Sequence, residues 1–267
     1  MFHIKGLTLP PIVNIVPAEV VTVLVANIPI LIIYVILSFM TIPSKISCII
    51  CAYNEEPRID TVLKAVSGHP AITEIIVVND GSTDGTAQKA TSYEGVRVIS
   101  HPRNIGKTAA IITGIEAAQY ELLMFLDADL INIDSNDITL LARPVLDGKS
   151  DISISLKQNS LSIMKFVGLD FCSGERVFSK TLFANKLQEM RTLSRFGAEV
   201  FLNRIVIKDH LRISVVRWNK VSHARKSEKI GIMKGTLGEI KMILDMLKVI
   251  SFVEIVSQNY KMLRARV

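Results

Sequence analysis

Two carboxylates separated by one residue, Asp127 and Asp129, follow the apolar run ELLMFL. Paired carboxylates suit a hard divalent cation such as Mg²⁺ or Mn²⁺, which can bridge a diphosphate and neutralise charge on a leaving group. The same pattern is common in turns after strands, where it forms an Asx turn or caps a helix. The pair alone therefore leaves both interpretations open.

Three other apolar runs also end in polar residues. These ends are Tyr53-Asn54-Glu55, then Asn79-Asp80-Gly81-Ser82, and then Arg103, Asn104, Gly106 and Lys107. Asp80 could make a simple turn, or it could accept hydrogen bonds from a base or ribose. Lys107 could be a solvated charge, or a cation that faces phosphate beside the positive end of a helix. The clustering of polar ends carries more information than any one of them.

The elements that position these residues follow from the apolar pattern. The runs ISCIICAY, EIIVVND, VRVIS and ELLMFLDAD have strand length, and segments with helical character separate them. Alternating strands and helices imply crossover connections and a mostly parallel sheet. Ligands bind beyond the carboxyl ends of such strands. The sequence therefore predicts an α/β, Rossmann-like domain with helices flanking a mostly parallel central sheet and a ligand site at one sheet edge.

Taken together, CAYNEE, VVNDGSTDGT, RNIGKTAAIITGI and FLDAD resemble the family 2 glycosyltransferases of the GT-A fold, over residues 45 to about 130. The four motifs recur in the family's order and at its spacing. The resemblance implies the following nucleotide-sugar-binding residues: Ala52, Tyr53, Glu55, Asp80, Ser82, Lys107, Asp127 and Ala128. Many members carry proline near the position of Ala52, a departure that affects the rigidity of the turn more than its chemistry.

The second half is similar to acceptor-side segments of the branch that contains glucosyl-3-phosphoglycerate synthases and polyprenyl-phosphate sugar transferases. In FCSGERVFSK the resemblance implies that Gly174, Glu175 and Arg176 line the acceptor site, with Arg176 suited to a phosphate. In RFGAEVFLNRIV it implies that Glu199 is the general base on the acceptor hydroxyl of an inverting enzyme. A surface carboxylate at the start of a helix is the alternative for Glu199.

The metal site implied by the resemblance combines Asp129 with His223. His223, in RWNKVSHARK, occupies the place of a late histidine that completes the metal site in related enzymes. Asp129 and His223 would hold Mg²⁺ or Mn²⁺ against the diphosphate, while Asp127 positions the ribose or the donor sugar. The alternative for His223 is a solvent-exposed side chain in a basic loop.

The first segment has the composition of a membrane helix. Residues 20–42 carry no charge, and about 20 apolar residues suffice to cross a bilayer. Membrane helices tolerate a proline such as Pro29. A signal peptide would be shorter and would end at a cleavage pattern, and a core helix would be apolar on every side. Residues 1–44 are therefore predicted to be a membrane anchor, although residues 11–42 could either span the bilayer once or lie within it.

Charge and composition narrow the partners. The net charge of +6 favours phosphate-rich partners, yet the chain has one tryptophan and no nucleic-acid-binding module, so DNA and RNA are not expected. Three cysteines, two of them in an apolar strand, do not form a disulfide framework. The basic, amphipathic C-terminal stretch could lie on an anionic membrane surface or pack on the domain's own core.

The predicted organisation is a membrane anchor at 1–44, a GT-A domain at 45–225 and a basic amphipathic C-terminal helix at 226–267. The predicted function is metal-dependent, inverting sugar transfer from a UDP- or GDP-sugar to a polyprenyl phosphate or another membrane-proximal acceptor. Because nucleotide sugars are cytosolic, the catalytic domain should face the cytoplasm.

Other functions remain open at this stage. A soluble acceptor of the glucosyl-3-phosphoglycerate type leaves the hydrophobic start unexplained. A sugar-phosphate nucleotidyltransferase usually has a basic, glycine-rich loop after its first strand, whereas Tyr53-Asn54-Glu55-Glu56 is acidic. A non-catalytic membrane partner would not need the Asp127–Asp129 pair.

Overall fold

The computed structural model describes residues 45–193, 197–224 and 251–267. The predicted membrane anchor at 1–44 and residues 225–250 of the predicted C-terminal helix lie outside these ranges. Within them, no helix combines the length and the apolar character that crossing a membrane requires. The described residues belong to one compact unit.

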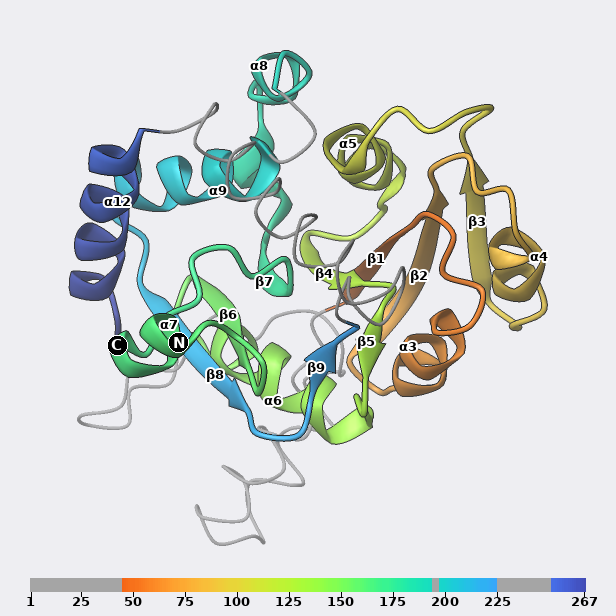
Figure 1. The fold of residues 1–267 in the computed structure, drawn as a ribbon, viewed down its shortest axis with the longest axis horizontal. Helices are drawn as coiled ribbons and strands as arrows, with labels where there is room; N and C mark the ends of the chain where they lie inside the picture. Colours follow the sequence, from red (N-terminus) through yellow and green to blue (C-terminus); the bar gives the residue numbers. More distant parts are fainter. Residues whose placement is uncertain (1–44, 194–196, 225–250) are drawn as a thin grey trace, which may run out of the picture. The chain divides into compact units, whose positions relative to one another are not determined.

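The described residues build a seven-stranded sheet in the order β3-β2-β1-β4-β7-β6-β8 (Figure 1). The strands are β1 (Ile46–Ala52), β2 (Ile72–Asn79), β3 (Val96–Ser100), β4 (Leu122–Asp127), β6 (Ile152–Lys157), β7 (Arg176–Ser179) and β8 (Ile213–Trp218). Only β7 runs antiparallel to its neighbours, β4 and β6. The predicted α/β fold with a mostly parallel sheet is therefore confirmed, and four of its strands lie where the apolar runs predict them.

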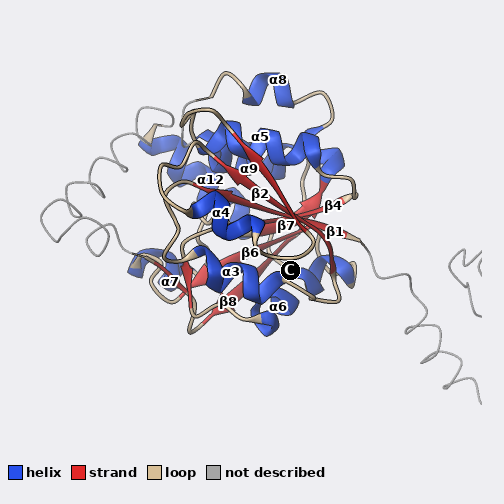
Figure 2. Ribbon diagram, turned by 90° about the vertical axis from the view of Figure 1, so that its right-hand side faces the viewer, coloured by secondary structure: helices blue, strands red, loops and turns tan. Residues whose placement is uncertain are grey.

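Helices cover both faces of this sheet, as Figure 2 shows. They are α3 (Ile59–Val66), α4 (Thr86–Thr91), α5 (Lys107–Ala117), α6 (Ser135–Leu146), α7 (Ser162–Val167), η1 (Lys180–Phe183), α8 (Leu187–Met190), α9 (Gly197–Lys208) and α12 (Phe252–Arg264). Successive strand residues point to opposite faces. Ile49 of β1 accordingly belongs to the hydrophobic cluster that includes residues of α5, α9 and α12, whereas Ile50 belongs to the cluster that includes residues of α3 and α6.

The described C-terminal residues pack on the domain. Met262 of α12 is fully buried, and Glu254 forms an ion pair with Arg204 of α9 at 2.8 Å. Beyond the helix, Arg266 forms a parallel bridge with Ile213 of β8. Residues 251–267 therefore pack on the domain, while most of the amphipathic stretch at 237–256, to which the two alternatives apply, lies outside the described residues.

Candidate active site

A cavity of about 470 Å³ opens where β1, β2 and β4 end and α5 begins. Seven of the eight predicted nucleotide-sugar-binding residues line it, namely Ala52, Tyr53, Glu55, Asp80, Lys107, Asp127 and Ala128. Asp129, Asn104 and Gly106 line it as well. The parallel sheet thus gathers at one edge the polar strand ends that the sequence distributes over 78 positions, from Ala52 to Asp129.

The turn after β1 is held by the loop after β2. Asn54 adopts a left-handed backbone with φ of 55°, and its N–H donates to Ser82 Oγ at 3.0 Å. The Asn54 side chain in turn accepts from the N–H of Thr83 at 2.8 Å. Ser82 is therefore a support for the turn and not a lining residue of the cavity. The ring of Tyr53 remains 46% exposed at the cavity.

Asp80 organises the loop that leads into α5. Its carboxylate accepts from the N–H groups of Ile105 at 3.0 Å and Gly106 at 2.8 Å. His101 Nδ1 donates to the same carboxylate at 2.8 Å. Next to Asp80, Gly81 has φ of +67°, and a Cβ there would come within 2.5 Å of the Asn104 nitrogen. The predicted contact of Asp80 with a nucleoside stays a prediction beside this structural role.

Lys107 joins the donor side of the cavity to α9. Its Nζ lies 2.7 Å from Asp127 Oδ1 and 2.9 Å from Glu199 Oε1. Burial alone would lower the pKa of Lys107, but the charges of Asp127 and Glu199 outweigh it and hold that pKa well above its ordinary value. Burial raises the pKa of Asp127 despite the neighbouring Lys107. The lysine is therefore a permanent cation between two predicted functional carboxylates.

Gly174 closes this cluster. A Cβ at Gly174 would lie 2.9 Å from both Lys107 Nζ and Asp127 Oδ1. A larger residue would force these two side-chain ends to shift, so the glycine lets the segment before β7 lie close to the ion pair. Of the three residues predicted on the acceptor side, Gly174 is the one that the structure brings to the cavity's charged groups.

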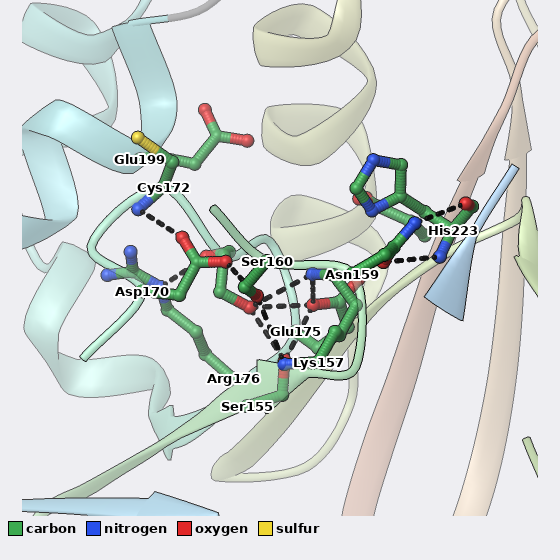
Figure 3. Close-up of polar contacts among 12 residues, drawn as sticks. Ser155, Lys157, Asn159, Ser160, Asp170, Cys172, Glu175, Arg176, Glu199 and His223 are labelled. Atoms are coloured by element: carbon green, nitrogen blue, oxygen red, sulfur yellow. Dashed lines mark hydrogen bonds and ion pairs between the residues drawn. The ribbon is translucent and has the colours of Figure 1, made fainter. Parts of the chain in front are cut away.

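Glu175 and Arg176 are fully buried (Figure 3). Lys157 Nζ lies 2.5 Å from Glu175 Oε2. Burial alone would raise the pKa of Glu175, but the charge of Lys157 and hydrogen bonds from Lys157, Ser173 and Ser155 lower it to about 2. Sequence reasoning missed Lys157, whose only signal is a cation at the end of an apolar strand.

Like Glu175, Arg176 forms its hydrogen bonds with other groups of the protein. Its three nitrogens donate to Ser173 O, Asn203 Oδ1 and Phe171 O, each at 2.8–2.9 Å. Burial lowers the pKa of its guanidinium. Neither Glu175 nor Arg176 lines the cavity, so their predicted contact with an acceptor stays a prediction while their observed contacts brace the segment before β7.

His223 comes to the end of β4 through a small second sheet. Strand β5 (Leu130–Ile131) pairs with β9 (Ser222–His223), with Leu130 opposite His223. The N–H of Ala224 donates to the carbonyl of Asp129 at 3.1 Å. Asn159 binds the backbone of His223 through two hydrogen bonds. Its Nδ2 donates to the carbonyl of His223 at 2.9 Å, and its Oδ1 accepts from the N–H of His223 at 3.3 Å. Asn159 is a second residue that sequence reasoning missed.

The donor set at Asp129 and His223 fits a cation that shares its coordination with a ligand. Among the described residues, no group of three or more His, Cys, Asp or Glu side chains is placed to hold an ion by itself. Mg²⁺ is usually bound through one or two carboxylates together with phosphate oxygens and waters. An aspartate directly before β5 and a histidine on its partner strand β9 match that pattern, with a diphosphate supplying further oxygens.

Cys51 is the one thiol at the cavity among the described residues. Burial raises its pKa to about 12, so the thiol stays protonated at neutral pH and is a poor nucleophile. The thiol is therefore not a candidate for the chemistry of this site, which leaves the carboxylates and Lys107 as the candidate groups at the cavity.

The comparisons with known proteins agree with this geometry. Residues 47–161 match the family model described as glycosyl transferase family 2. A dolichyl-phosphate beta-glucosyltransferase from Trichomonas vaginalis is 32% identical over 161 residues, covering 48% of this chain and 46% of that protein. A dodecaprenyl-phosphate galacturonate synthase from Rhizobium johnstonii is 32% identical over 124 residues, covering 43% and 36%. The chain thus spans less than half the length of these relatives.

Solved structures extend the likeness beyond residues 47–161. Glucosyl-3-phosphoglycerate synthase from Mycobacterium tuberculosis, in complex with Mn²⁺ and UDP-glucose, superposes with a TM-score of 0.58 at 25% identity. The superposition covers 77% of this chain and 79% of that one. The strand-end motifs, the sheet and the family match together assign residues 47–161 to glycosyl transferase family 2, so the chain carries a family 2 glycosyltransferase domain.

Proposed function

We propose that this domain transfers a sugar from a nucleotide diphosphate donor, held in the 470 Å³ cavity, to a polyprenyl phosphate at a membrane surface. The observation that carries the proposal is the charged cluster at the cavity. Lys107 joins Asp127 to Glu199, and the strand that carries His223 is paired to the residues after Asp129. Donor-side and acceptor-side residues predicted from distant segments meet at this point.

The donor would lie across the strand ends. Tyr53 and Glu55 offer an exposed ring and a carboxylate to the nucleoside, with Asp80 at the base of the cavity. Asp127, oriented by Lys107 at 2.7 Å, would position the ribose or the donor sugar. The solved structure with UDP-glucose supports a UDP-sugar as the first donor to test.

Asp129 and His223 would hold Mg²⁺ or Mn²⁺ beside the diphosphate. A divalent cation in this place supplies charge neutralisation for the departing nucleoside diphosphate. The protein itself would keep Asp129 and His223 close together. Leu130, next to Asp129, pairs with His223, and Asn159 binds the backbone of His223. The M. tuberculosis relative, whose structure contains Mn²⁺, supports this choice of cation.

Glu199 faces the cluster from α9 and is the candidate general base. A single displacement, in which the acceptor attacks the anomeric carbon opposite the nucleotide, would invert the configuration of the sugar. With a hydroxyl acceptor, Glu199 would remove the proton as the new bond forms. A phosphate monoester has a second pKa of about 6, so a lipid phosphate is mostly a dianion at neutral pH and needs this base less.

The two lipid-phosphate relatives support the polyprenyl phosphate acceptor. The likeness to glucosyl-3-phosphoglycerate synthase, which covers more of the chain, favours a second candidate, a small phosphorylated acceptor with a free hydroxyl. The two candidates differ in their need for a base. Replacement of Glu199 should therefore lower the rate of transfer to a hydroxyl far more than the rate of transfer to a phosphate dianion.

The test is turnover of UDP- and GDP-sugars by the purified full chain with Mn²⁺, with and without polyprenyl phosphate. Release of nucleoside diphosphate that rises with the lipid supports both the transferase and its acceptor class. Release that rises with 3-phosphoglycerate but not with the lipid moves the acceptor to the second candidate. Absence of release with every donor and acceptor would refute the proposed function.

A further inference from the structure

The connection between β6 and β7, residues 158–175, carries large apolar side chains on its surface. Phe166 of α7 is 88% exposed, the highest value among the large hydrophobic residues in the described ranges that are exposed. Leu161, directly before the same helix, is 57% exposed. Figure 1 places α7 at the edge of the domain, next to the C-terminus. Isolated apolar side chains on a surface are ordinary. Two large ones on one short helix and the residue before it, Phe166 and Leu161, form a candidate contact surface.

This exposure is not that of a loose loop, because both ends of α7 are held: Ser160, before the helix, donates to Asp170 Oδ2 at 2.6 Å, and the C-terminal turn is fixed as follows. Gly168 ends the helix in the left-handed conformation, and its N–H donates to Met164 O at 2.8 Å. Met164 packs against the core, and Leu169, immediately after the turn, is fully buried. Phe166 is thus held outward by neighbours that are themselves anchored.

The charges around this tip are positive. Lys165 precedes Phe166 and is itself exposed. On the other side, a Cβ at Gly168 would lie 2.9 Å from Arg266 Nη1 and 3.4 Å from Arg217 Nη2, so both guanidinium groups border the turn. Apolar side chains beside basic ones are typical of elements that lie in a membrane interface, where anionic headgroups attract Lys and Arg.

The base of the same connection belongs to the active site. Lys157 and Glu175 tie its two ends together at 2.5 Å. Asn159 holds His223, and Gly174 meets Lys107 and Asp127. A surface contact made at Phe166 would therefore be made by the segment whose other end lies against the charged cluster.

We infer that the α7 tip, defined as Leu161, Lys165 and Phe166, inserts into the interface of an anionic bilayer and holds the active site at the membrane. The membrane contact stands on exposure, clamping and charge alone. The further statement, that this contact presents a lipid-phosphate acceptor to the cavity, rests on the proposed function.

The test needs a local probe, because the predicted anchor at 1–44 would by itself hold the full chain on vesicles. The chain has one tryptophan, Trp218, which is 1% exposed and gives a constant background. Phe166→Trp in the full chain is reconstituted into phosphatidylcholine–phosphatidylglycerol vesicles whose acyl chains are brominated. The matched control is Leu140→Trp on α6, where the native side chain is 42% exposed.

We expect emission from position 166 to shift to the blue and to be quenched at least threefold more than emission from position 140. Quenching at 166 should fall in vesicles of phosphatidylcholine alone and when Lys165→Glu is added. Equal quenching at the two positions would overturn the inference. A second result would also overturn it. If emission from position 166 is already blue-shifted in the protein without lipid or detergent, and brominated lipid does not quench it, another part of the chain covers the tip.

A functional measurement links the tip to the acceptor. Phe166→Ser should raise the KM for polyprenyl phosphate in vesicles about tenfold, since burying one Phe is worth roughly one factor of ten or more. The KM for the nucleotide sugar should not change. If no donor is turned over but position 166 is quenched, the membrane contact stands and the proposed function fails. If the lipid is glycosylated while positions 166 and 140 are quenched equally, the proposed function stands and the membrane contact of the α7 tip fails.

Discussion

Replacing Lys157 with methionine removes the cation that neutralises Glu175 inside the domain. The two side chains are 5% and 0% exposed, and their charged atoms lie 2.5 Å apart. Methionine keeps most of the volume of the lysine stem, so the change leaves packing nearly intact and isolates the charge. Glu175 would keep only hydroxyl donors, those of Ser155 at 2.8 Å and Ser173 at 2.6 Å.

Two routes give the size of the effect. Removing one partner of a buried ion pair costs about 3–5 kcal/mol of unfolding free energy, because the other charge is left uncompensated. Independently, the pKa of Glu175 is held at about 2 against an ordinary value of 4.5. That difference corresponds to about 3 kcal/mol of stability at neutral pH. Because that pKa also contains the hydrogen bonds from Ser155 and Ser173, which the variant keeps, the ion-pair cost of about 3–5 kcal/mol sets the prediction.

The pH dependence follows from the same pKa. Because the pKa of Glu175 is lower in the folded than in the unfolded chain, its stabilisation is complete above pH 4.5 and is lost as the pH falls towards 2. The wild-type protein should therefore lose this part of its stability in that window. Lys157→Met has already lost it at pH 7, so the gap between the two proteins should narrow as the pH falls.

The assay is urea unfolding followed by the fluorescence of Trp218, the single tryptophan, which lies opposite Lys157 on β8. Far-ultraviolet circular dichroism serves as a probe of the whole fold. The double variant Lys157→Met/Glu175→Gln, which removes both charges, is the control and should recover at least half of the loss. A single variant within about 0.5 kcal/mol of wild type, or a gap that does not change with pH, would refute the account of the pair.

Three further changes probe the cavity. Gly174→Ala should lower kcat several-fold, because its Cβ would displace the side-chain ends of Lys107 and Asp127, 2.9 Å away, by a few tenths of an ångström, less than the 1 Å shift that can cost about 10²-fold; a kcat within twofold of wild type would contradict the fit. Glu199→Gln should lower kcat by about 10²–10⁴-fold with a hydroxyl acceptor, but by far less with polyprenyl phosphate above pH 7; equal losses with both would contradict its role as base. Asp129→Asn should abolish the Mn²⁺-dependent part of UDP binding in calorimetry while the unfolding curve stays unchanged, and unaltered Mn²⁺ dependence would remove Asp129 from the cation site.

The half of the fold that forms most of the cavity could be predicted from the sequence because its signals are local. Each of the first strands is a continuous apolar run that ends in a polar group, and parallel pairing brings those ends to one edge without further information. The structure places Ala52, Asp80 and Asp127 together for this reason. Ser82, for which the resemblance implies nucleotide-sugar binding, accepts from the N–H of Asn54 in the structure, and its contact with a donor stays a prediction.

The acceptor side could not be predicted at the same depth because its contacts are non-local. Nothing in GER distinguishes an arginine that binds phosphate from one that is fully buried and donates to three protein oxygens, as Arg176 does. The partner of Glu175 is Lys157, 18 positions away on another strand. Strand β9 is only two residues long. It is too short for an alternating apolar pattern in the sequence to indicate that this strand brings His223 close to Asp129.

The most direct test of the central claim follows the sugar itself. Full-length protein, reconstituted with polyprenyl phosphate, is given Mn²⁺ and UDP-glucose with a radiolabelled sugar, beside Asp129→Asn and the same protein in chelator. We predict labelled lipid with a β-linked sugar from the α-linked donor, and loss of that product in Asp129→Asn and in chelator. Labelled lipid with the donor's configuration retained, or equal transfer by wild type and Asp129→Asn, would contradict the account.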